Sequence, residues 1–191
     1  FGRLSIIYGP PGTGKTYMLK SLISEIHSPN RLIAYFPVDL LRQMRQIDII
    51  ALFTDTARLS RKKSFVIFIE DCDDFLAKRS LDAHNASSVS ILLNMADGFV
   101  GEALDIRIIV TTNLPKVSLD DAIKRPGRLN RICEVKALDK DKANILYRKN
   151  TQGEESPFDK SASLASVFEK IYEADNKGTG FKTSNPVGFK A

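Results

Sequence analysis

Short apolar runs alternate with stretches of helical periodicity over residues 1–136 of the chain. The runs are rich in β-branched and aromatic residues, and they cover Leu4–Tyr8, Leu32–Phe36, Phe65–Ile69, Ile106–Val110 and Ile132–Val135. Buried strands of this kind, separated by helical segments, are typical of a parallel sheet with helices packed on it. The pattern therefore predicts an α/β fold whose five-stranded parallel sheet is flanked by helices.

The helices of this region are predicted from the spacing of their apolar residues. They are expected at Lys15–Ile26, Ile47–Leu59, Ser87–Ala96 and, as a short segment, after Ser118. The first helix places Leu19, Leu22 and Ile23 on one face. The last would begin with a capping box formed by Ser118 and Asp121.

The pattern changes after residue 136. Asp139–Lys149 reads as a polar helix, and the apolar residues of a second helix are Leu164, Val167, Phe168, Ile171 and Tyr172. The polar stretch Thr151–Lys160 reads as a flexible connection, and glycine and proline become frequent beyond Ala174. We therefore expect an α/β core over residues 1–136 and an incomplete helical subdomain over residues 137–191.

A phosphate-binding loop of the form G-x-x-x-x-G-K-T joins the first strand to the first helix. It reads Gly9-Pro10-Pro11-Gly12-Thr13-Gly14-Lys15-Thr16. Glycines let backbone N–H groups point at phosphates, and the following helix adds its positive end. In this arrangement Lys15 neutralises the outer phosphates and the Thr16 hydroxyl is a ligand of Mg²⁺. A chance match on a glycine-rich turn is the alternative, and the strand and helix on either side argue against it.

Two adjacent carboxylates, Glu70 and Asp71, follow the predicted strand Phe65–Ile69. Open α/β sheets bind ligands at the carboxyl ends of their strands. Neighbouring side chains on an extended chain point in different directions, so one carboxylate can reach the magnesium shell and the other the attacking water. A polar strand end without a function is the alternative. Combined with the phosphate loop, the pair predicts nucleotide hydrolysis.

Composition and charge change this picture little. The chain has 191 residues, of which 43% are hydrophobic, enough for a sizeable core. A net charge of +5 would suit an acidic partner, but the basic residues are scattered. The dense cluster Arg58–Lys63 is interpreted as a solvated loop, because no aromatic residues interleave its charges as in nucleic-acid sites. No apolar stretch is long enough to cross a bilayer.

The two cysteines, Cys72 and Cys133, lack the spacing of a metal or redox site. A cytoplasmic or other reduced intracellular compartment is therefore expected. A targeting signal, an anchor or a partner domain could precede Phe1, and this sequence would not contain it.

In this order the motifs resemble the AAA family of ATPases over nearly the whole chain. The loop of that family reads G-P-P-G-T-G-K-T, as Gly9–Thr16 does here. The usual Asp-Glu strand end is reversed to Glu70-Asp71, which is similar to the clade that contains the mitochondrial Rieske-protein translocase. Leu92–Gly98 also resembles the L-L-N-x-x-D-G helix end of that clade. The resemblance implies a P-loop NTPase core followed by a small helical lid.

The resemblance also implies roles for the polar strand ends. Glu70 takes the place of the magnesium ligand and Asp71 that of the residue that polarises water, although the two roles could be exchanged. Because Asp is one methylene shorter than Glu, Asp71 needs a loop shift or an intervening water to reach the nucleophile. Thr111-Thr112-Asn113 resembles the first sensor motif of the family, in which the Asn113 amide orients the attacking water.

Arg125-Pro126-Gly127-Arg128 resembles the R-x-G-R element from which the family sends arginine fingers into a neighbouring subunit. A guanidinium group there offsets the charge that develops on the transferred phosphoryl group. The resemblance therefore implies that Arg125 and Arg128 act in trans and that the chain self-associates into a hexamer-like ring. A surface turn with two solvated arginines is the alternative.

Two segments depart from the family pattern. Where the pore loop of the family carries an aromatic-apolar-glycine triplet, the chain has Arg42-Gln43-Met44-Arg45-Gln46. The second sensor region corresponds to Gly180–Asn185, which contains no arginine. Threading of a polypeptide and a second sensor are therefore not carried over from the family.

Taken as a sequence, the chain is expected to bind and hydrolyse ATP with Mg²⁺ and to remodel or translocate a macromolecule, in the first place a protein. Two alternatives stay open. One is an ATP-driven loader or helicase accessory that acts on nucleic acid. The other is a nucleotide-dependent assembly switch that does not hydrolyse, which the reversed carboxylates would explain.

Overall fold

The structure is a computed structural model. It describes residues 2–43, 46–60, 64–78, 94, 98–125, 127–151, 153 and 155–177. The chain divides into two compact units, Phe1–Val135 and Lys136–Ala191. Each unit is described by itself.

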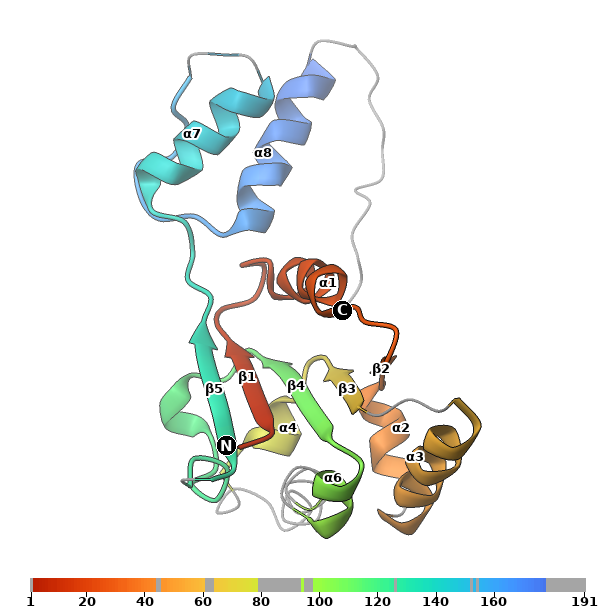
Figure 1. The fold of residues 1–191 in the computed structure, drawn as a ribbon. Coiled ribbons are helices and arrows are strands. Elements are labelled where there is room, and N and C mark those ends of the chain that lie inside the picture. Colours follow the sequence, from red (N-terminus) through yellow and green to blue (C-terminus); the bar gives the residue numbers. More distant parts are fainter. Residues whose placement is uncertain are drawn as a thin grey trace. The chain divides into compact units, whose positions relative to one another are not determined.

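A parallel sheet of five strands forms the centre of the first unit (Figure 1). Its strands are β1 (Leu4–Tyr8), β2 (Arg31–Tyr35), β3 (Ser64–Ile69), β4 (Ile106–Thr112) and β5 (Leu129–Glu134). They are ordered β2-β3-β4-β1-β5, and each neighbouring pair is parallel. The predicted P-loop NTPase fold with a five-stranded parallel sheet is therefore confirmed.

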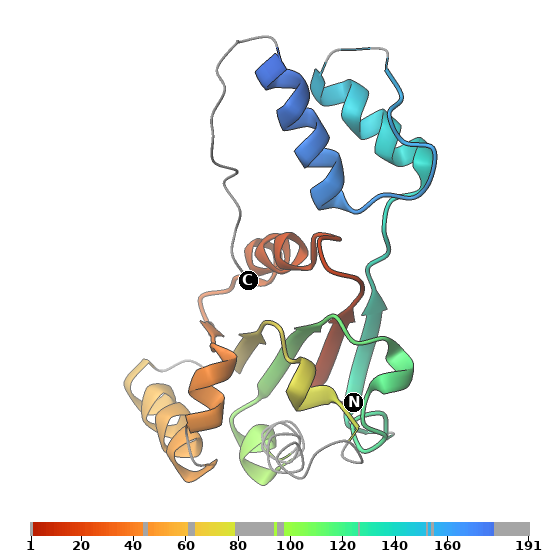
Figure 2. The same cartoon turned by 180° about the vertical axis from the view of Figure 1, so that it is seen from behind.

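Helices pack on both faces of this sheet. Among the described residues of the first unit, the helices are α1 (Lys15–Ile26), α2 (Val38–Gln43), α3 (Gln46–Ser60), α4 (Asp73–Leu76) and α6 (Phe99–Ala103). Helix α1 packs on one face, where Leu19 joins a core cluster with Ile7 and Phe68. The opposite face carries α2, α3 and α4, and α4 lies behind the sheet in Figure 1 and in front of it in Figure 2.

Strand β1 shows how the sequence assigns side chains to these faces. Leu4 and Ile6 are buried in the larger core cluster, whereas Ile7 belongs to the cluster under α1. Successive residues of a strand point to opposite faces, so odd positions of β1 lie on the α1 side. Buried apolar residues on both faces explain why the strands read as continuous apolar runs.

The short helix expected after Ser118 is wrong. A 3₁₀ turn, Lys116–Ser118, ends there, and the amide of Asp120 donates to the carbonyl of Leu76 at 2.8 Å. The Ser118 carbonyl in turn accepts from the Lys78 amide at 3.2 Å, whereas a helix capped by Ser118 would use that carbonyl for its first intrahelical hydrogen bond. The capping box with Asp121 therefore does not form. The helix expected at residues 87–96 lies outside the described residues except for Asn94.

The described part of the second unit contains two helices, α7 (Lys140–Thr151) and α8 (Leu164–Lys177). Their small core consists of Ala143, Tyr147, Val167 and Ile171. The connection between the helices is fixed by Asn144, whose amide donates to the carbonyl of Phe158 at 2.8 Å and whose Oδ1 accepts from the Phe158 amide at 3.0 Å. In the described part of the chain, no helix is long and apolar enough to cross a membrane.

Candidate functional site

The phosphate-binding loop lies at the carboxyl end of β1, an inner strand of the sheet between β4 and β5, and leads directly into α1. Its backbone has two glycines in the left-handed region, Gly12 at φ 74° and Gly14 at φ 95°. Only glycine adopts such angles without strain. The following helix has 12 residues, and its first N–H groups lack partners within the helix, so they face the space over the loop. The loop therefore has the geometry that receives an anion.

Gly9 is required for a different reason. A Cβ atom at this position would lie 2.1 Å from the carbonyl oxygen of Val135. The Gly9 amide also donates to the carbonyl of Thr112 at 3.2 Å. Any larger residue would therefore push the phosphate loop away from the ends of β4 and β5.

Lys15 is the buried cation of the site. Its side chain is 7% exposed, and its Nζ donates to the carbonyls of Gly9 at 2.8 Å and Pro10 at 3.0 Å. Nζ also donates to Oδ1 of Asn113 at 2.7 Å. Burial lowers the pKa of Lys15, and the nearby carboxylates of Asp71 and Asp73 oppose that shift. The ammonium group thus links the phosphate loop to the end of β4.

Asn113 is held in turn by a residue that the sequence analysis did not single out, Asp73. Its Oδ1 accepts from the Asn113 amide at 2.8 Å and from the Thr112 hydroxyl at 2.6 Å. Its Oδ2 accepts from Asn113 Nδ2 at 3.4 Å. Asp73 is the first residue of α4, which follows the turn after β3, and its hydrogen bonds to Thr112 and Asn113 join this turn to the end of the neighbouring strand β4. The only signal in the sequence was its place in the acidic run of residues 70–74.

The two predicted carboxylates lie at the same edge of the sheet. Glu70 directly follows β3 and is half-buried, whereas Asp71 is exposed. Asp71 has a left-handed backbone with φ 53°, and its amide donates to the Thr111 hydroxyl at 3.1 Å. The two carboxylates thus belong to a turn that is fastened to β4.

The negative charge at this edge also affects neighbouring groups. The pKa of Tyr35, at the end of β2, is raised by burial and by the charges of Glu70 and Asp71. The pKa of Cys72 is raised by burial and by Asp73 and Asp71. Cys72 is fully buried and its Sγ donates to the carbonyl of Ile69, so it acts as a core residue.

Arg125 and Arg128 lie at the other end of the sheet. They precede β5, whose Leu129 pairs with Leu4 at the start of β1, whereas the phosphate loop follows the end of β1. Strand β1 has five residues, so its start, near the two arginines, and its end, at the phosphate loop, are roughly 16 Å apart. Arg128 is half-buried and its Nη1 donates to the carbonyl of Ala122 at 3.0 Å, whereas Arg125 is exposed. Neither arginine is therefore brought to the phosphate loop of its own chain.

Several predicted features lie outside the described residues. These are Met44 and Arg45, most of Leu92–Gly98, and Gly180–Asn185. Arg42 is described, and its guanidinium pairs with Asp74 of α4 and lies 5.9 Å from the ring centre of Phe75. Thr16, the predicted metal ligand of the loop, is exposed in the first turn of α1.

The strand order, the glycine-containing loop at the end of β1 and the polar residues that follow β3 and β4 define a P-loop nucleoside triphosphatase. The family model described as "ATPase family associated with various cellular activities (AAA)" matches residues 5–137. The chain therefore belongs to the AAA family of ATPases.

Comparison with individual proteins agrees with this assignment. The chain is 31% identical over 184 residues to the proteasome-activating nucleotidase of Methanococcus vannielii, covering 90% of this chain and 42% of that protein. It is 36% identical over 141 residues to the enzyme of the same name from Methanocaldococcus jannaschii, covering 70% of this chain and 31% of that protein.

A third relative is the ATPase family gene 2 protein of Schizosaccharomyces pombe, which is 33% identical over 144 residues, or 71% of this chain and 16% of that protein. The chain thus spans less than half the length of each of these three relatives.

Proposed function

We propose that the chain binds ATP together with Mg²⁺ and hydrolyses it in order to remodel or translocate a protein partner. One observation carries this proposal: Lys15, Asn113 and Asp73 form a continuous set of hydrogen bonds that joins the phosphate loop to the ends of β4 and β3. Membership of the AAA family supports the choice of ATP as the nucleotide.

The oxygen donors at the site fit a magnesium ion. Mg²⁺ is usually held by one or two side-chain oxygens together with water and phosphate oxygens. The Thr16 hydroxyl and the Glu70 carboxylate supply such donors from the ends of β1 and β3, and no large ligand cluster is needed. When bound, the ion neutralises charge on the phosphates. Thr16 and Glu70 are therefore the residues that we propose to hold it.

The remaining residues of the site are proposed to position the attacking water and the phosphates. We assign to Asp71 the role of polarising the attacking water and to Asn113 that of positioning it, since both follow strands adjacent to each other in the sheet. Lys15 offsets charge on the outer phosphates, and Gly9 to Gly14 present backbone N–H groups to them. A switch that binds ATP without hydrolysis is the alternative, and the exposed, short side chain of Asp71 favours it.

The chain is proposed to work as a hexamer-like ring. The position of Arg125 and Arg128 at the amino end of β5 supports action on a neighbouring subunit, because the phosphate loop of the same chain lies at the opposite end of β1. The names of the relatives support a protein as the partner, since two of them are proteasome-activating nucleotidases.

Three finer assignments belong to the same proposal. We place the nucleotide-binding core at residues 1–136 and an incomplete lid at residues 137–191, which agrees with the compact units and with the matched range. The order Glu70-Asp71 supports the clade of the mitochondrial Rieske-protein translocase, although the relatives compared above are other AAA proteins. The free cysteines support a reduced, cytoplasmic location.

Replacing Lys15 with alanine tests nucleotide binding directly. The change removes the one buried ammonium group of the loop, so the affinity for ATP with Mg²⁺ should fall about a hundredfold, as expected for lost charge-assisted hydrogen bonds. Isothermal titration would measure it. Lys20→Ala, on the exposed side of the same helix, is the matched control. Equal affinity of Lys15→Ala and the unchanged chain would remove the proposal.

A further inference from the structure

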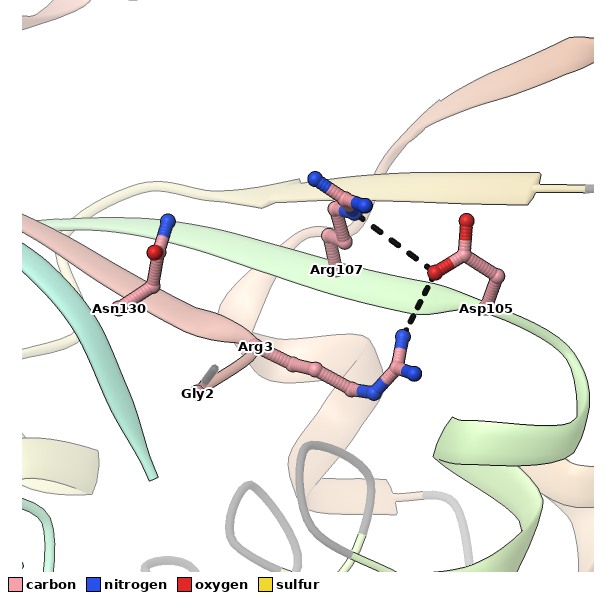
Figure 3. A pocket seen from close by; sticks show the side chains of 5 residues that line it. All are labelled: Gly2, Arg3, Asp105, Arg107 and Asn130. Carbon is pink, nitrogen blue, oxygen red and sulfur yellow. Dashed lines mark hydrogen bonds and ion pairs between the residues drawn. The ribbon is translucent and has the colours of Figure 1, made fainter. Parts of the chain in front are cut away.

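A shallow hollow lies at the amino ends of β1, β4 and β5, at the opposite end of the sheet from the phosphate loop (Figure 3). Its volume is about 380 Å³, and it is lined by Gly2, Arg3, Asp105, Arg107 and Asn130. The proposed hydrolysis assigns no role to these residues, and the proposed ring names only Arg125 and Arg128 at this end of the sheet. The hollow therefore needs an explanation of its own.

The register of the sheet places its two arginines side by side. Leu4 of β1 pairs with Ile108 of β4, and the Ile108 amide donates to the carbonyl of Arg3 at 2.8 Å. Arg3 and Arg107 each precede one of these paired residues, so they lie on the same face of the sheet. This is the face on which α1 packs farther along the strands.

Asp105 holds the two guanidinium groups together. Its Oδ1 lies 2.7 Å from Nη1 of Arg3 and 3.7 Å from Nε of Arg107. Asp105 also has a left-handed backbone with φ 45°, which is uncommon for a residue with a side chain but is tolerated by Asp and Asn. Figure 3 shows that the interactions of both arginines end on the same oxygen of this carboxylate. The pair of guanidinium groups is thus preorganised.

The hollow has more donors than acceptors. A guanidinium group carries five N–H donors. Within the described residues, Arg3 donates one hydrogen bond, to Asp105, and Arg107 makes an ion pair with Asp105 but no hydrogen bond. Asn130 Nδ2 donates one hydrogen bond, to Ser5 Oγ at 3.2 Å, and its second N–H remains available as a donor. Arg107 is 61% exposed, so its remaining donors face solvent. Two guanidinium groups and one carboxylate leave one positive charge.

We propose that this hollow binds one carboxylate side chain from an acidic segment of a partner protein. A carboxylate accepts paired N–H groups from guanidinium and brings the charge of the hollow to neutral. A phosphate dianion would leave it negative beside Asp105. The occupant is thus an Asp or Glu side chain, received next to Asp105 by Arg3, Arg107 and the free amide hydrogen of Asn130.

Fluorescence anisotropy with a labelled hexaglutamate peptide tests the proposal, with hexaglutamine as the reference peptide. Arg107→Gln should weaken hexaglutamate binding about tenfold, because it removes a charge-assisted donor. Asp105→Asn removes the competing negative charge, while the Asn oxygen can still accept from Arg3 and the residue tolerates the left-handed backbone, so binding should tighten about threefold. Arg58→Gln, on exposed α3, loses the same charge and should change affinity less than about twofold.

The titrations are repeated in Lys15→Ala, because the phosphate loop also attracts anions. Unchanged hexaglutamate affinity in that variant excludes the phosphate loop as the peptide's site, so that the effects of Arg107→Gln and Asp105→Asn report on the hollow whatever becomes of the nucleotide site. The proposal is overturned if Arg58→Gln and Arg107→Gln weaken binding equally, if Asp105→Asn weakens it, or if hexaglutamate binds no better than hexaglutamine. Thermal unfolding of each variant checks that the fold is kept.

Discussion

Asp73 is the residue on which the geometry of the nucleotide site depends most. It accepts three hydrogen bonds from Thr112 and Asn113, and Asn113 accepts from Lys15. An ionised carboxylate can only accept, which fixes the Asn113 amide with its Oδ1 toward Lys15. Amide orientation at the end of β4 therefore follows from a side chain at the start of α4.

Replacing Asp73 with asparagine should slow turnover without preventing ATP binding. The amide NH₂ group of the new asparagine can face Asn113, which itself donates, so that a hydrogen bond to Asn113 is lost. One charge-assisted hydrogen bond is worth about 1.5–3 kcal/mol. The expected loss in kcat is therefore about ten- to a hundredfold, with the Kd for ATP nearly unchanged. Single-turnover hydrolysis and titration measure the two quantities. Asp55→Asn, on exposed α3, is the control, and an unaltered kcat in Asp73→Asn would contradict the role.

Replacing Glu70 and replacing Asp71, the two carboxylates after β3, should impair different steps of the reaction. Glu70→Gln should weaken binding of ATP in the presence of Mg²⁺, because it removes a charged metal donor. Asp71→Asn should leave binding nearly intact and stop turnover, because it removes the group that polarises water. Titration with and without Mg²⁺, followed by single-turnover hydrolysis, separates these effects. If the two variants show the reverse pattern, the roles of Glu70 and Asp71 have to be exchanged.

For single residues, the sequence predicts those site residues that belong to a recognisable motif. Lys15 and Asn113 were predicted from the loop and from the position after a strand, and the structure joins them by a hydrogen bond. Asp73 was not predicted, because it is one of four carboxylates within residues 70–74 and spacing does not say which of them turns toward β4. That information requires the pairing of β3 with β4.

Among the elements, α4 has only four residues and depends on packing for its stability. Phe75 is fully buried in the larger core cluster. The Arg42–Asp74 ion pair that ties α4 to α2 is 46% and 64% exposed at its two side chains. Exposed ion pairs contribute about 0–1 kcal/mol, whereas burial of an aromatic ring contributes several kcal/mol. Burial rather than charge therefore holds α4.

Urea unfolding followed by circular dichroism should show this difference. Phe75→Ala should lower the free energy of unfolding by about 3–5 kcal/mol, the usual cost of removing a buried aromatic ring. Asp74→Asn should lower it by less than about 1 kcal/mol. Arg42→Ala combined with Asp74→Asn gives the coupling energy of the pair. Equal losses for Phe75→Ala and Asp74→Asn would mean that the ion pair anchors α4.

The elements with long apolar periodicity were predicted well. Helix α1 has the predicted bounds, and α3 extends the prediction by one residue at each end. Strand β5 begins at Leu129 rather than at Ile132, because Asn130 and Arg131 are exposed and hide the start of this edge strand in the sequence. The helix expected after Ser118 does not form because the backbone of Ser118 and Asp120 pairs with Lys78 and Leu76 at the end of α4, a contact between distant segments.

For the whole molecule, the position of the two arginines suggests that a single chain has an incomplete site. The half-buried guanidinium of Arg128 contacts the carbonyl of Ala122 in its own chain, and Arg125 is exposed. Both lie at the end of the sheet opposite to the phosphate loop. An arginine supplied in trans can raise the rate of phosphoryl transfer about a thousandfold or more. Turnover per chain should therefore rise steeply with protein concentration.

Mixing two inactive variants tests this account most directly. Lys15→Ala chains keep both arginines but lack a working phosphate loop, whereas Arg125→Ala chains keep the loop but lack the exposed arginine. Steady-state ATP hydrolysis is measured for each variant alone and for mixtures in which co-assembly has been demonstrated. The account predicts that activity partly returns, because some neighbours then combine an intact loop with an intact arginine. Absence of recovery, or full activity of a dilute monomer, would contradict it.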